Sequence, residues 1–456
     1  MTLTAYSPLR NCNFNHPTLV DVSERLSVAP QQLAINWLIR QRNVVTIPKS
    51  SNRERQRDNL ESVKLEVSEF DQKLLDDFMA KVPSTMIMKE KPSPKDAFIL
   101  ARGEYDQPTE KVGRALPAAL PPLPESQPND RLGLARWLVS GDHPLTGRVW
   151  VNRIWERLFG FGIVKTSENF GSQAEWPVHP ELLDWMAVEF AKPTALPRVD
   201  KQPAKPWDMK AFIKLIMMSK AYRQKSSAPE EYFKRDPDNR LLARGPRFRL
   251  TGELVRDQAL ASSGLLIHAI GGPSVRPYMP KGVWSETNRY GNLRNYEADD
   301  GDGLYRRSMY TFWKRTAAPP SMLLFDAPNR EVCYPKRSRT NTPLQALALM
   351  NEVTYVEAAR SLAERMMKEG GQSVRERLIT GYRLATSRSP NEETLAILRK
   401  GFEKRRSFFL QDEKTALQMI SHGKKQPDNN LTTGELAAYT VTANVLLNLD
   451  QVITKD

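Results

Sequence analysis

Residues 342–366 read TPLQALALMNEVTYVEAARSLAERM, and this stretch decides the fold. Thr342 and Pro343 form a typical helix start, because a threonine hydroxyl caps free backbone N–H groups and proline is tolerated in the first turn. Apolar residues then recur at helical spacing, which predicts one long helix through Met366. Such an apolar stripe must be covered by neighbouring elements. The stretch therefore predicts a domain of packed helices.

Similar helical stripes occur on both sides of this stretch. On the N-terminal side they comprise Val151, Ile154, Trp155 and Leu158, then Leu183, Met186 and Phe190, then Phe212, Leu215 and Ile216. On the C-terminal side, residues 389–392 (SPNE) predict a capping box, and Thr433 precedes a closing helix through Leu447. Residues 305–313 are the best strand candidate. We therefore expect a mainly α fold, in which residues 130–456 form a helical domain with a minor β component.

Residues 84–129 have a different composition. Prolines gather at positions 117, 121, 122, 124 and 128, and no helical period continues through them. This segment is expected to be an extended lead-in to the helical domain.

Residues 1–83 alternate between strand and helix patterns. The expected elements are, in order, a strand at 3–9, helices at 18–26 and 30–41, a β-branched strand at 43–48, and a further helix capped by Ser51 or Asn52. On the second helix, Leu33, Ala34, Trp37 and Leu38 are expected to share one face. The order predicts a βαβα fragment with parallel strands.

The second strand-to-helix turn of this fragment gathers polar and cationic residues. They are Lys49, Ser50, Ser51, Asn52 and Arg55. A helix N-terminus with free N–H groups attracts anions, and two cations with two hydroxyls suit a phosphate monoester. An ordinary capped helix with a basic first turn is the alternative.

The runs AYSPL, LVDVSERLSVAPQQLAINWLIRQ and VVTIPKSSNRERQRDNLE resemble the C-terminal quarter of aldo-keto reductases. The resemblance implies NADPH contacts at Ser7, Leu9, Lys49, Ser50, Ser51, Asn52, Arg55, Asp58 and Asn59. Asp58 replaces the glutamate common in that family. The family's barrel has eight strand–helix units, of which this fragment supplies the last two, and the family's catalytic Asp, Tyr, Lys and His lie upstream of them. The resemblance therefore implies a truncated TIM barrel with a weak NADPH remnant site and no catalytic residues.

Composition and charge limit the functional classes. With 40% hydrophobic and 26% charged residues, the chain resembles ordinary globular protein. The net charge is +14, but the cations are interspersed with acids in no long block, so we expect no nucleic-acid binding. Two groups come closest to a basic, aromatic patch: Arg306, Arg307, Tyr310, Phe312, Trp313, Lys314 and Arg315, then Lys336, Arg337 and Arg339.

Membrane and cysteine signals are weak. No stretch approaches the roughly 20 apolar residues of a membrane span, and the start MTLTAYSPLR lacks the apolar region of a secretory signal, so we expect a cytoplasmic chain as written. Cys12 and Cys333 offer no spacing for a disulfide framework, a zinc site or c-type haem attachment.

Catalytic patterns are hard to find in residues 84–456. His143 and His179 each precede a proline, which favours turn or cap roles over metal binding. The acidic residues Glu297, Asp299, Asp300 and Asp302 lack the closing glutamate of an EF-hand, so a disordered loop is preferred over a calcium site. Gly271–Ser274 is too short for a phosphate cradle. We predict no metal ligands and no nucleophile here.

Long runs of residues 84–456 carry a second resemblance. They include NDRLGLARWLVSGDHPLTGRVWVNRIWERLFGFGIVKTSENFGSQ, DPDNRLLARGPRFRLTGELVRDQALA and YRRSMYTFWKRTAAPPSMLLFDAPNREVCYPKRSRTNTPLQALALMN. These are similar to a planctomycete domain of unknown function that follows cytochrome c-type modules in large exported proteins. The resemblance implies cytochrome c-type modules as partners, with no haem in this chain. Abundant Trp and Tyr suit a partner or glycan surface.

The sequence favours a non-catalytic binding or scaffold domain fused to an inactive reductase remnant. An uncharacterised enzyme in the C-terminal domain is the second hypothesis, and perturbed acids in a cleft would favour it. An NADPH-dependent oxidoreductase, with the missing barrel supplied elsewhere, is the third. The two resemblances meet near residues 82–84 without a linker, which fits a degenerate fusion or an assembly join at least as well as a selected bifunctional protein.

Overall fold

The computed structural model describes residues 3–6, 14–41, 44–48, 52–79, 88–91, 93–198, 202–284, 296–314 and 316–455. The chain forms two compact units, residues 1–113 and 114–456. Helices make up 51% and strands 5%, which confirms the predicted mainly α class. The strands of the described residues form three two-stranded sheets, and none closes into a barrel. No helix among the described residues is both long and apolar enough to cross a membrane.

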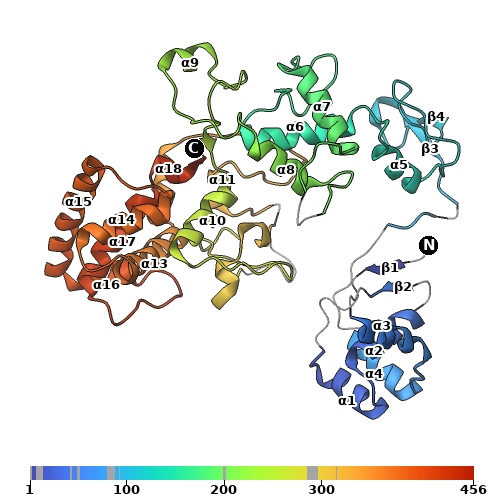
Figure 1. The fold of residues 1–456 in the computed structure, drawn as a ribbon, viewed down its shortest axis with the longest axis horizontal. Coiled ribbons are helices and arrows are strands. Elements are labelled where there is room, and N and C mark those ends of the chain that lie inside the picture. The colour runs from blue at the N-terminus through green and yellow to red at the C-terminus, as the bar shows by residue number, and fades with distance from the viewer. Residues whose placement is uncertain are drawn as a thin grey trace. The chain divides into compact units, whose positions relative to one another are not determined.

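The N-terminal unit begins with the expected strand and helix order. Its elements are β1 (Leu3–Tyr6), α1 (Pro17–Leu26), α2 (Pro30–Arg40), β2 (Val44–Ile47), α3 (Arg53–Glu61), α4 (Glu69–Met79), β3 (Ala97–Leu100) and β4 (Pro108–Val112). Strands β1 and β2 pair in parallel, with Leu3 opposite Val44. Figure 1 shows these strands beside the helices α2 and α3. The predicted βαβα order is confirmed.

An apolar cluster lies between the helices of this unit. Among the described residues its buried members are Leu19, Val22, Leu33 and Leu75, from α1, α2 and α4. The predicted face of α2 was partly wrong, because Leu33 is buried whereas Ala34, Trp37 and Leu38 are half-buried, and Ile35 and Asn36 are buried instead. The Asn36 amide is needed inside, since its Nδ2 donates to the Ser62 carbonyl at 2.7 Å.

The proline-rich lead-in contains a hairpin that the composition did not predict. Strands β3 and β4 pair antiparallel, with a register shift between Phe98 and Leu100. Every residue of both strands is exposed. Arg102, in the connecting turn, has a φ of 52°. The strands at 97–100 and 108–112 are themselves extended, and what composition does not reveal is that they pair with each other.

Almost all regular elements of the C-terminal unit are helices. Its elements are α5 (Arg131–Leu138), α6 (Thr146–Phe159), α7 (Pro180–Ala191), α8 (Met209–Met218), α9 (Glu230–Arg235), β5 (Phe248–Arg249), α10 (Gly252–Ser263), α11 (Pro320–Leu324), α12 (Pro343–Asn351), α13 (Val353–Glu369), α14 (Val374–Thr386), α15 (Glu392–Gln411), α16 (Glu413–Ile420), α17 (Thr433–Leu447), α18 (Asp450–Ile453) and β6 (Thr454–Lys455). Strands β5 and β6 pair antiparallel.

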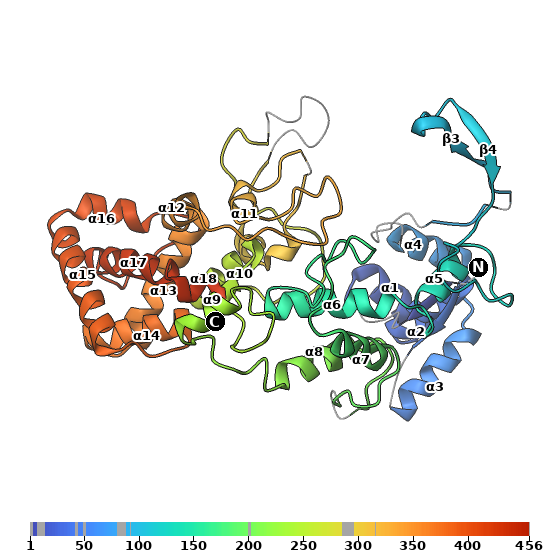
Figure 2. The same cartoon turned by 90° about the horizontal axis from the view of Figure 1, so that it is seen from above.

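Helices α13 and α17 form the centre of the larger core. They pack against each other, α10 and α14 contact α13, and α15 and α16 contact α17. Figure 2 shows α13 and α17 with α14, α15 and α16 around them. The predicted long helix is split into α12 and α13, because Glu352 adopts an extended ψ of 138° and its side chain accepts from the N–H of Thr354. The Thr342–Gln345 capping box is present at the start of α12.

A second core lies between α6, α7 and α8. Its buried residues include Val151, Ile154 and Trp155 of α6, with Leu183, Met186 and Phe190 of α7 and Phe212 and Ile216 of α8. Leu215 is only half-buried. These stripes confirm that helical periodicity identified the buried faces.

Two other local predictions were wrong. Residues 305–313 do not form the predicted strand. Two 3-10 helices, Gly301–Tyr305 and Ser308–Tyr310, occupy most of this segment. Its only β-type pairings among the described residues are isolated bridges, such as the one between Val275 and Thr311. At α15 the cap is Asn391, which accepts from the Thr394 N–H at 2.8 Å, so the capping box from Ser389 is absent. Helix α17 runs to Leu447 as expected, but Thr433 is its first residue and Thr432, one residue earlier than predicted, is the N-cap.

Candidate functional site

An open cavity in the C-terminal unit lies along the segment between α11 and α12. Its volume is about 380 Å³, and all its lining residues fall within 323–338. Leu323, Asp326, Tyr334, Lys336 and Arg337 are among them. This volume is within the range of small-molecule and peptide-anchor sites. We call residues 323–338 with this cavity the α11–α12 cleft.

A carboxylate fixes the shape of the α11–α12 cleft. Asp326 has a φ of 60°, a left-handed conformation that aspartate tolerates better than most residues. Its Oδ2 accepts from the Thr340 N–H at 2.7 Å, and both carboxylate oxygens accept from the Thr340 hydroxyl at 2.9 and 3.1 Å. Asp326 therefore ties together the two ends of the segment.

Arg337 is also committed to the fold. Its Nη1 donates to both carboxylate oxygens of Glu253 at 2.8 and 2.9 Å. Burial alone would raise the pKa of Glu253, but hydrogen bonds from Arg337 outweigh it and hold that pKa below its usual value. The pair joins the cleft to the first turn of α10.

The two basic, aromatic groups in the sequence meet at this cleft. Trp313, from the first group, donates from Nε1 to the Asn329 carbonyl at 3.3 Å, and the Arg330 guanidinium lies 4.2 Å from the Trp313 ring centre. Lys336, from the second group, is exposed at the rim. Arg330 was missed because its φ of 65° and its stacking partner come from tertiary contacts.

Other members of these two groups are used inside the fold. Arg306 stacks on Tyr310 at 3.9 Å and donates to the carbonyls of Ala269, Gly271 and Pro273, so the Gly271–Ser274 turn is clamped by an arginine. Arg339 donates to the Gly160 carbonyl at 2.6 Å. Arg315 lies outside the described residues. The cationic surface is thus smaller than the sequence suggested.

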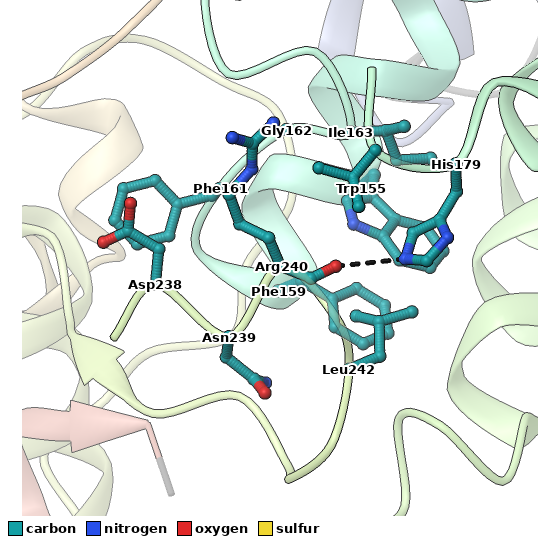
Figure 3. Close-up of a pocket in the computed structure, with 11 residues that line it drawn as sticks. Trp155, Phe159, Phe161, Gly162, Ile163, His179, Asp238, Asn239, Arg240 and Leu242 are labelled. Carbon is teal, nitrogen blue, oxygen red and sulfur yellow. Dashed lines mark hydrogen bonds between the residues drawn. The ribbon is translucent and has the colours of Figure 1, made fainter. Parts of the chain in front are cut away.

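A smaller cavity, of about 10 Å³, lies between the end of α6 and the loop before β5 (Figure 3). Trp155, Phe159 and Phe161 form apolar walls, and Asp238 and Arg240 are the charged residues of the lining. The His179 ring bonds the Arg240 carbonyl through Nε2 at 3.1 Å, as the dashed line marks. His179 occupies the N-cap position of α7 but makes no side-chain cap bond.

His143 behaves as expected of a turn histidine. Its Nδ1 accepts from the N–H groups of Leu145 and Thr146 at 3.3 and 3.1 Å, just before α6. Its ring also packs edge-on against Trp137, with ring centres 4.3 Å apart. These contacts give the histidine a structural role.

The acidic segment around Asp300 is ordered by a lysine, in place of the disordered loop expected. Lys424 Nζ donates to the carbonyls of Ala298 and Asp299 at 3.1 Å and to Asp300 Oδ1 at 2.5 Å. Asp299 Oδ2 accepts from the Arg276 N–H at 2.8 Å. Within the described ranges, no group of acids, histidines and cysteines could hold a metal ion.

A network of buried polar side chains surrounds α13. Glu357 is fully buried, and its Oε1 accepts from the Tyr305 hydroxyl at 2.9 Å and from the Lys425 N–H at 2.8 Å. Arg360, 1% exposed, donates to the carbonyls of Ile420, His422 and Lys425. In the sequence, this network is marked by the charged residues Glu357, Arg360 and Glu364 on an otherwise apolar face of the helix. The network holds the segment between α16 and α17 in place.

Acids with raised pKa values are the usual sign of catalysis in a cleft. Burial raises the pKa of Glu352, against opposing hydrogen bonds from Thr354. This side chain caps α13 and lines none of the cavities described above. Burial also raises the pKa of Tyr278, to about 12, where its hydroxyl accepts from the Lys424 N–H at 2.6 Å. Both groups serve the packing of the helices.

The residues expected to contact NADPH lie only partly within the described chain. Ser7, Leu9, Lys49, Ser50 and Ser51 fall outside the described residues. Asn52 is the N-cap of α3, and its Oδ1 accepts from the Glu54 and Arg55 N–H groups at 2.9 and 3.2 Å. Arg55 is exposed, and Asp58 and Asn59 are half-buried on the same helix. Of the predictions for this turn, the structure confirms that Asn52 caps the start of α3.

The fold and cavities define a mainly helical domain with an open cleft and a densely hydrogen-bonded core. The model of the PSD1 family, described as "Protein of unknown function (DUF1553)", matches residues 130–402, and the chain belongs to this family. The second resemblance, to a domain of unknown function, is thereby confirmed. Comparisons with curated proteins and with solved structures return no match.

Proposed function

We propose that residues 130–456 form a non-catalytic binding domain that takes up an acidic segment of a partner at the α11–α12 cleft. The observation that carries this proposal is the set of exposed cations at the cleft: Lys336 lines the cavity, and Arg330, which follows the lining residue Asn329, is exposed and stacks on Trp313. Asp326 and Glu253 are already bonded within the fold. Lys336 Nζ donates to the Lys165 carbonyl at 3.4 Å, but Lys336 and Arg330 are both exposed, so their positive charges remain accessible to a ligand. Such surfaces favour acidic partners through charge complementarity.

The use of the remaining charges supports binding over catalysis. Arg360 and Arg306 donate to backbone carbonyls, and the raised-pKa acid Glu352 caps a helix. These groups stabilise the fold, whereas an enzyme site would aim such groups into a cleft. The resemblance to domains that follow cytochrome c-type modules suggests such a module as the source of the acidic segment. An acidic glycan is the second candidate, because Tyr334 and Trp313 offer stacking faces.

The test uses the full chain with two acidic probes, a short poly-glutamate peptide and an oligogalacturonate, and neutral dextran as the uncharged control. We expect the peptide to bind with an affinity that falls as salt rises, and R330A/K336A to weaken binding about tenfold. The variant K400A/K404A, with the same charge change on exposed α15 positions, should bind like the original chain. Failure of both acids to bind, or equal loss in the two variants, would refute the proposal. Preference for the oligogalacturonate would favour the glycan candidate. Chemical turnover of either probe would favour the enzyme hypothesis.

We propose further that residues 1–83 are an inactive aldo-keto reductase remnant. The parallel pairing of β1 with β2 and the capped start of α3 support this reading. A remnant of the NADPH site at Lys49, Ser50 and Arg55 would contact only the adenosine 2′-phosphate, so 2′-phospho-adenosine should bind nearly as well as NADPH. Calorimetry tests this. Arg55→Ala should abolish binding of both, and micromolar NADPH binding without binding of the adenosine fragment would show a complete pocket and refute the proposal.

A further inference from the structure

The outer face of helix α12 is apolar. The helix sequence, PLQALALMN, contains no charged residue. Gln345 and Leu349 face the core and are buried, whereas Leu344, Leu347 and Met350 are each about half exposed. These three exposed residues follow one another at intervals of three positions, so they form a row about 9 Å long on one side of the helix. We call Leu344, Leu347 and Met350 the α12 row.

A helix of this composition is normally covered. Helices at a protein surface carry charged or polar residues on their outer face, and a helix that is apolar on all sides is usually buried. Helix α12 contacts α11, α13 and α17, and Figure 2 shows it along the upper edge of the bundle. A single exposed leucine is common, but a row of three on an uncharged helix is typical of a binding surface. The α12 row therefore indicates a surface that a partner covers.

The α12 row lies next to the α11–α12 cleft. Gln345 Nε2 donates to the Leu324 carbonyl at 2.9 Å and to the Thr340 hydroxyl at 3.0 Å. Thr340 is in turn bonded to Asp326, which lines the cavity. Leu323, another lining residue, has an exposed apolar side chain. Because these bonds fasten the first turn of α12 to the cleft, one ligand can contact both.

The charges beside the α12 row favour an acidic partner. Residues 323–351 contain four cations and two acids. Of the cations, Lys336 and Arg330 are exposed, whereas of the acids Asp326 is half-buried and bonded to Thr340, and Glu331 is exposed. A partner with apolar residues for the row and carboxylates for the two exposed cations is complementary in both respects.

The shape of the α12 row indicates the conformation of the partner. A helix presents residues i, i+3 or i+4, and i+7 on one face over about 10 Å, which matches the length of the row. Rows of side chains on two helices also interdigitate well. An extended segment would instead need an unpaired sheet edge, and a helix offers none because its backbone groups bond internally.

We propose that the α12 row and the α11–α12 cleft together bind one amphipathic helix of the partner, with its apolar face on the row and its acidic residues at Lys336 and Arg330. This inference rests on the function proposed above, and it adds a helical conformation and an apolar face to the acidic segment. Binding therefore requires the right spacing of apolar residues as well as negative charge. An acidic segment without an apolar face binds more weakly.

The experiment uses the full chain and three labelled synthetic peptides, followed by fluorescence anisotropy. The first peptide is helical, with leucines on one face and glutamates beside them. The second has the same composition in a scrambled order, so that its leucines share no face, and the third is poly-glutamate. We expect the helical peptide to bind about tenfold more tightly than the scrambled one, because only it buries leucines against the row. This comparison uses the original chain, so it does not depend on how a variant folds.

The variant L347Q/M350Q removes two apolar side chains of the α12 row. Glutamine has nearly the helix propensity of leucine and methionine, so the helix should be kept. We expect this variant to bind the helical peptide about tenfold more weakly, and poly-glutamate as the original chain does. The matched control is L410Q/L417Q, at apolar side chains of similar exposure on α15 and α16, and it should bind both peptides unchanged.

The inference is overturned if the helical and scrambled peptides bind equally, or if the two glutamine variants behave alike. It is also overturned if sedimentation shows that the chain self-associates and that L347Q/M350Q abolishes this, because a second copy would then cover the row. In each of these cases, poly-glutamate binding that R330A/K336A weakens leaves the proposed function standing. Absence of binding by all three peptides overturns both proposals.

Discussion

The two units of this chain differ in how completely they bury their apolar faces. Among the described residues of the N-terminal unit, the buried apolar cluster consists of Leu19, Val22, Leu33 and Leu75. The C-terminal unit surrounds α13 and α17 with α10, α14, α15 and α16. The two faces of a short parallel sheet must be covered by helices, and a few helices cannot cover both. In a layered helix bundle, each helix covers the apolar face of its neighbour. The comparison shows that correct local structure alone does not provide a large core.

The units also differ in how they treat charge. In the N-terminal unit, Arg25 bonds Asp21 and Asp71 but remains 40% exposed. In the C-terminal unit, Arg360 is 1% exposed and sits between Glu357 and Glu364 on α13. Buried ion pairs are costly to break, because removing one partner leaves the other desolvated and unpaired. The larger core therefore depends on a few polar contacts as well as on apolar packing.

The largest expected effect is at Arg360. Arg360→Ala should lower the free energy of unfolding of the C-terminal unit by about 3–5 kcal/mol, because it removes donors to three carbonyls and takes the nearby guanidinium away from the buried Glu357. Thermal unfolding followed by circular dichroism measures this. Arg399→Ala, which removes an exposed pair with Glu403, should cost less than about 1 kcal/mol. Similar losses in both variants would contradict the role of the buried network.

A change in the small core should separate the two units. Leu33→Ala should destabilise the N-terminal unit by about 2–5 kcal/mol, because Leu33 is fully buried and few neighbours can fill the space. Hydrogen exchange should then show loss of protection in α1 and α2 while α13 and α17 stay protected. The control is Leu60→Ala, since Leu60 is 73% exposed. Parallel loss of protection in α13 would show that the units depend on each other for stability.

A smaller effect is expected from Lys455 on β6. Burial lowers the pKa of Lys455 to about 8 from an ordinary 10.5, where its Nζ donates to the Leu158 carbonyl at 2.9 Å and lies 4.0 Å from the Tyr222 ring centre. The folded chain thus holds this proton less tightly than the unfolded chain. The free energy of unfolding should therefore rise as pH increases from about 8 toward 10.5.

Lys455→Met tests this pH dependence. Urea midpoints measured on both sides of pH 8 should rise less with pH in the variant than in the original chain. Lys400→Met, at an exposed position of α15, should leave the dependence unchanged. An identical pH dependence in the original chain and Lys455→Met would rule out Lys455 as its source.

The smallest effect on stability is expected in the lead-in. Residues 89–128 should be the first site of limited proteolysis, since all residues of β3 and β4 are exposed. Phe98→Asp, at a side chain 42% exposed, should change the unfolding midpoint little and accelerate cleavage there. Mass spectrometry of early fragments measures this, and early cleavage within α12 or α13 would contradict the expectation.

The sequence by itself determined the features that depend on short-range spacing. Periodicity identified the buried stripes of α6 and α7, and proline or Asn placement identified the starts of α2 and α3. Such patterns predict helical faces because a helix places residues three and four apart on one face. They predict helix starts because the first N–H groups of a helix are free to bond a nearby side chain. The mainly α class followed from them.

Only the tertiary structure decided the features that join distant residues. The break at Glu352, the 3-10 helices in place of a strand near Tyr305, and the hairpin β3–β4 all depend on partners that short-range patterns do not specify. The candidate site is of the same kind, because Arg330 meets Trp313 across 17 positions. Whether a charged side chain is exposed, paired or left with free donors depends on the packing around it, and residue identity alone does not fix that packing.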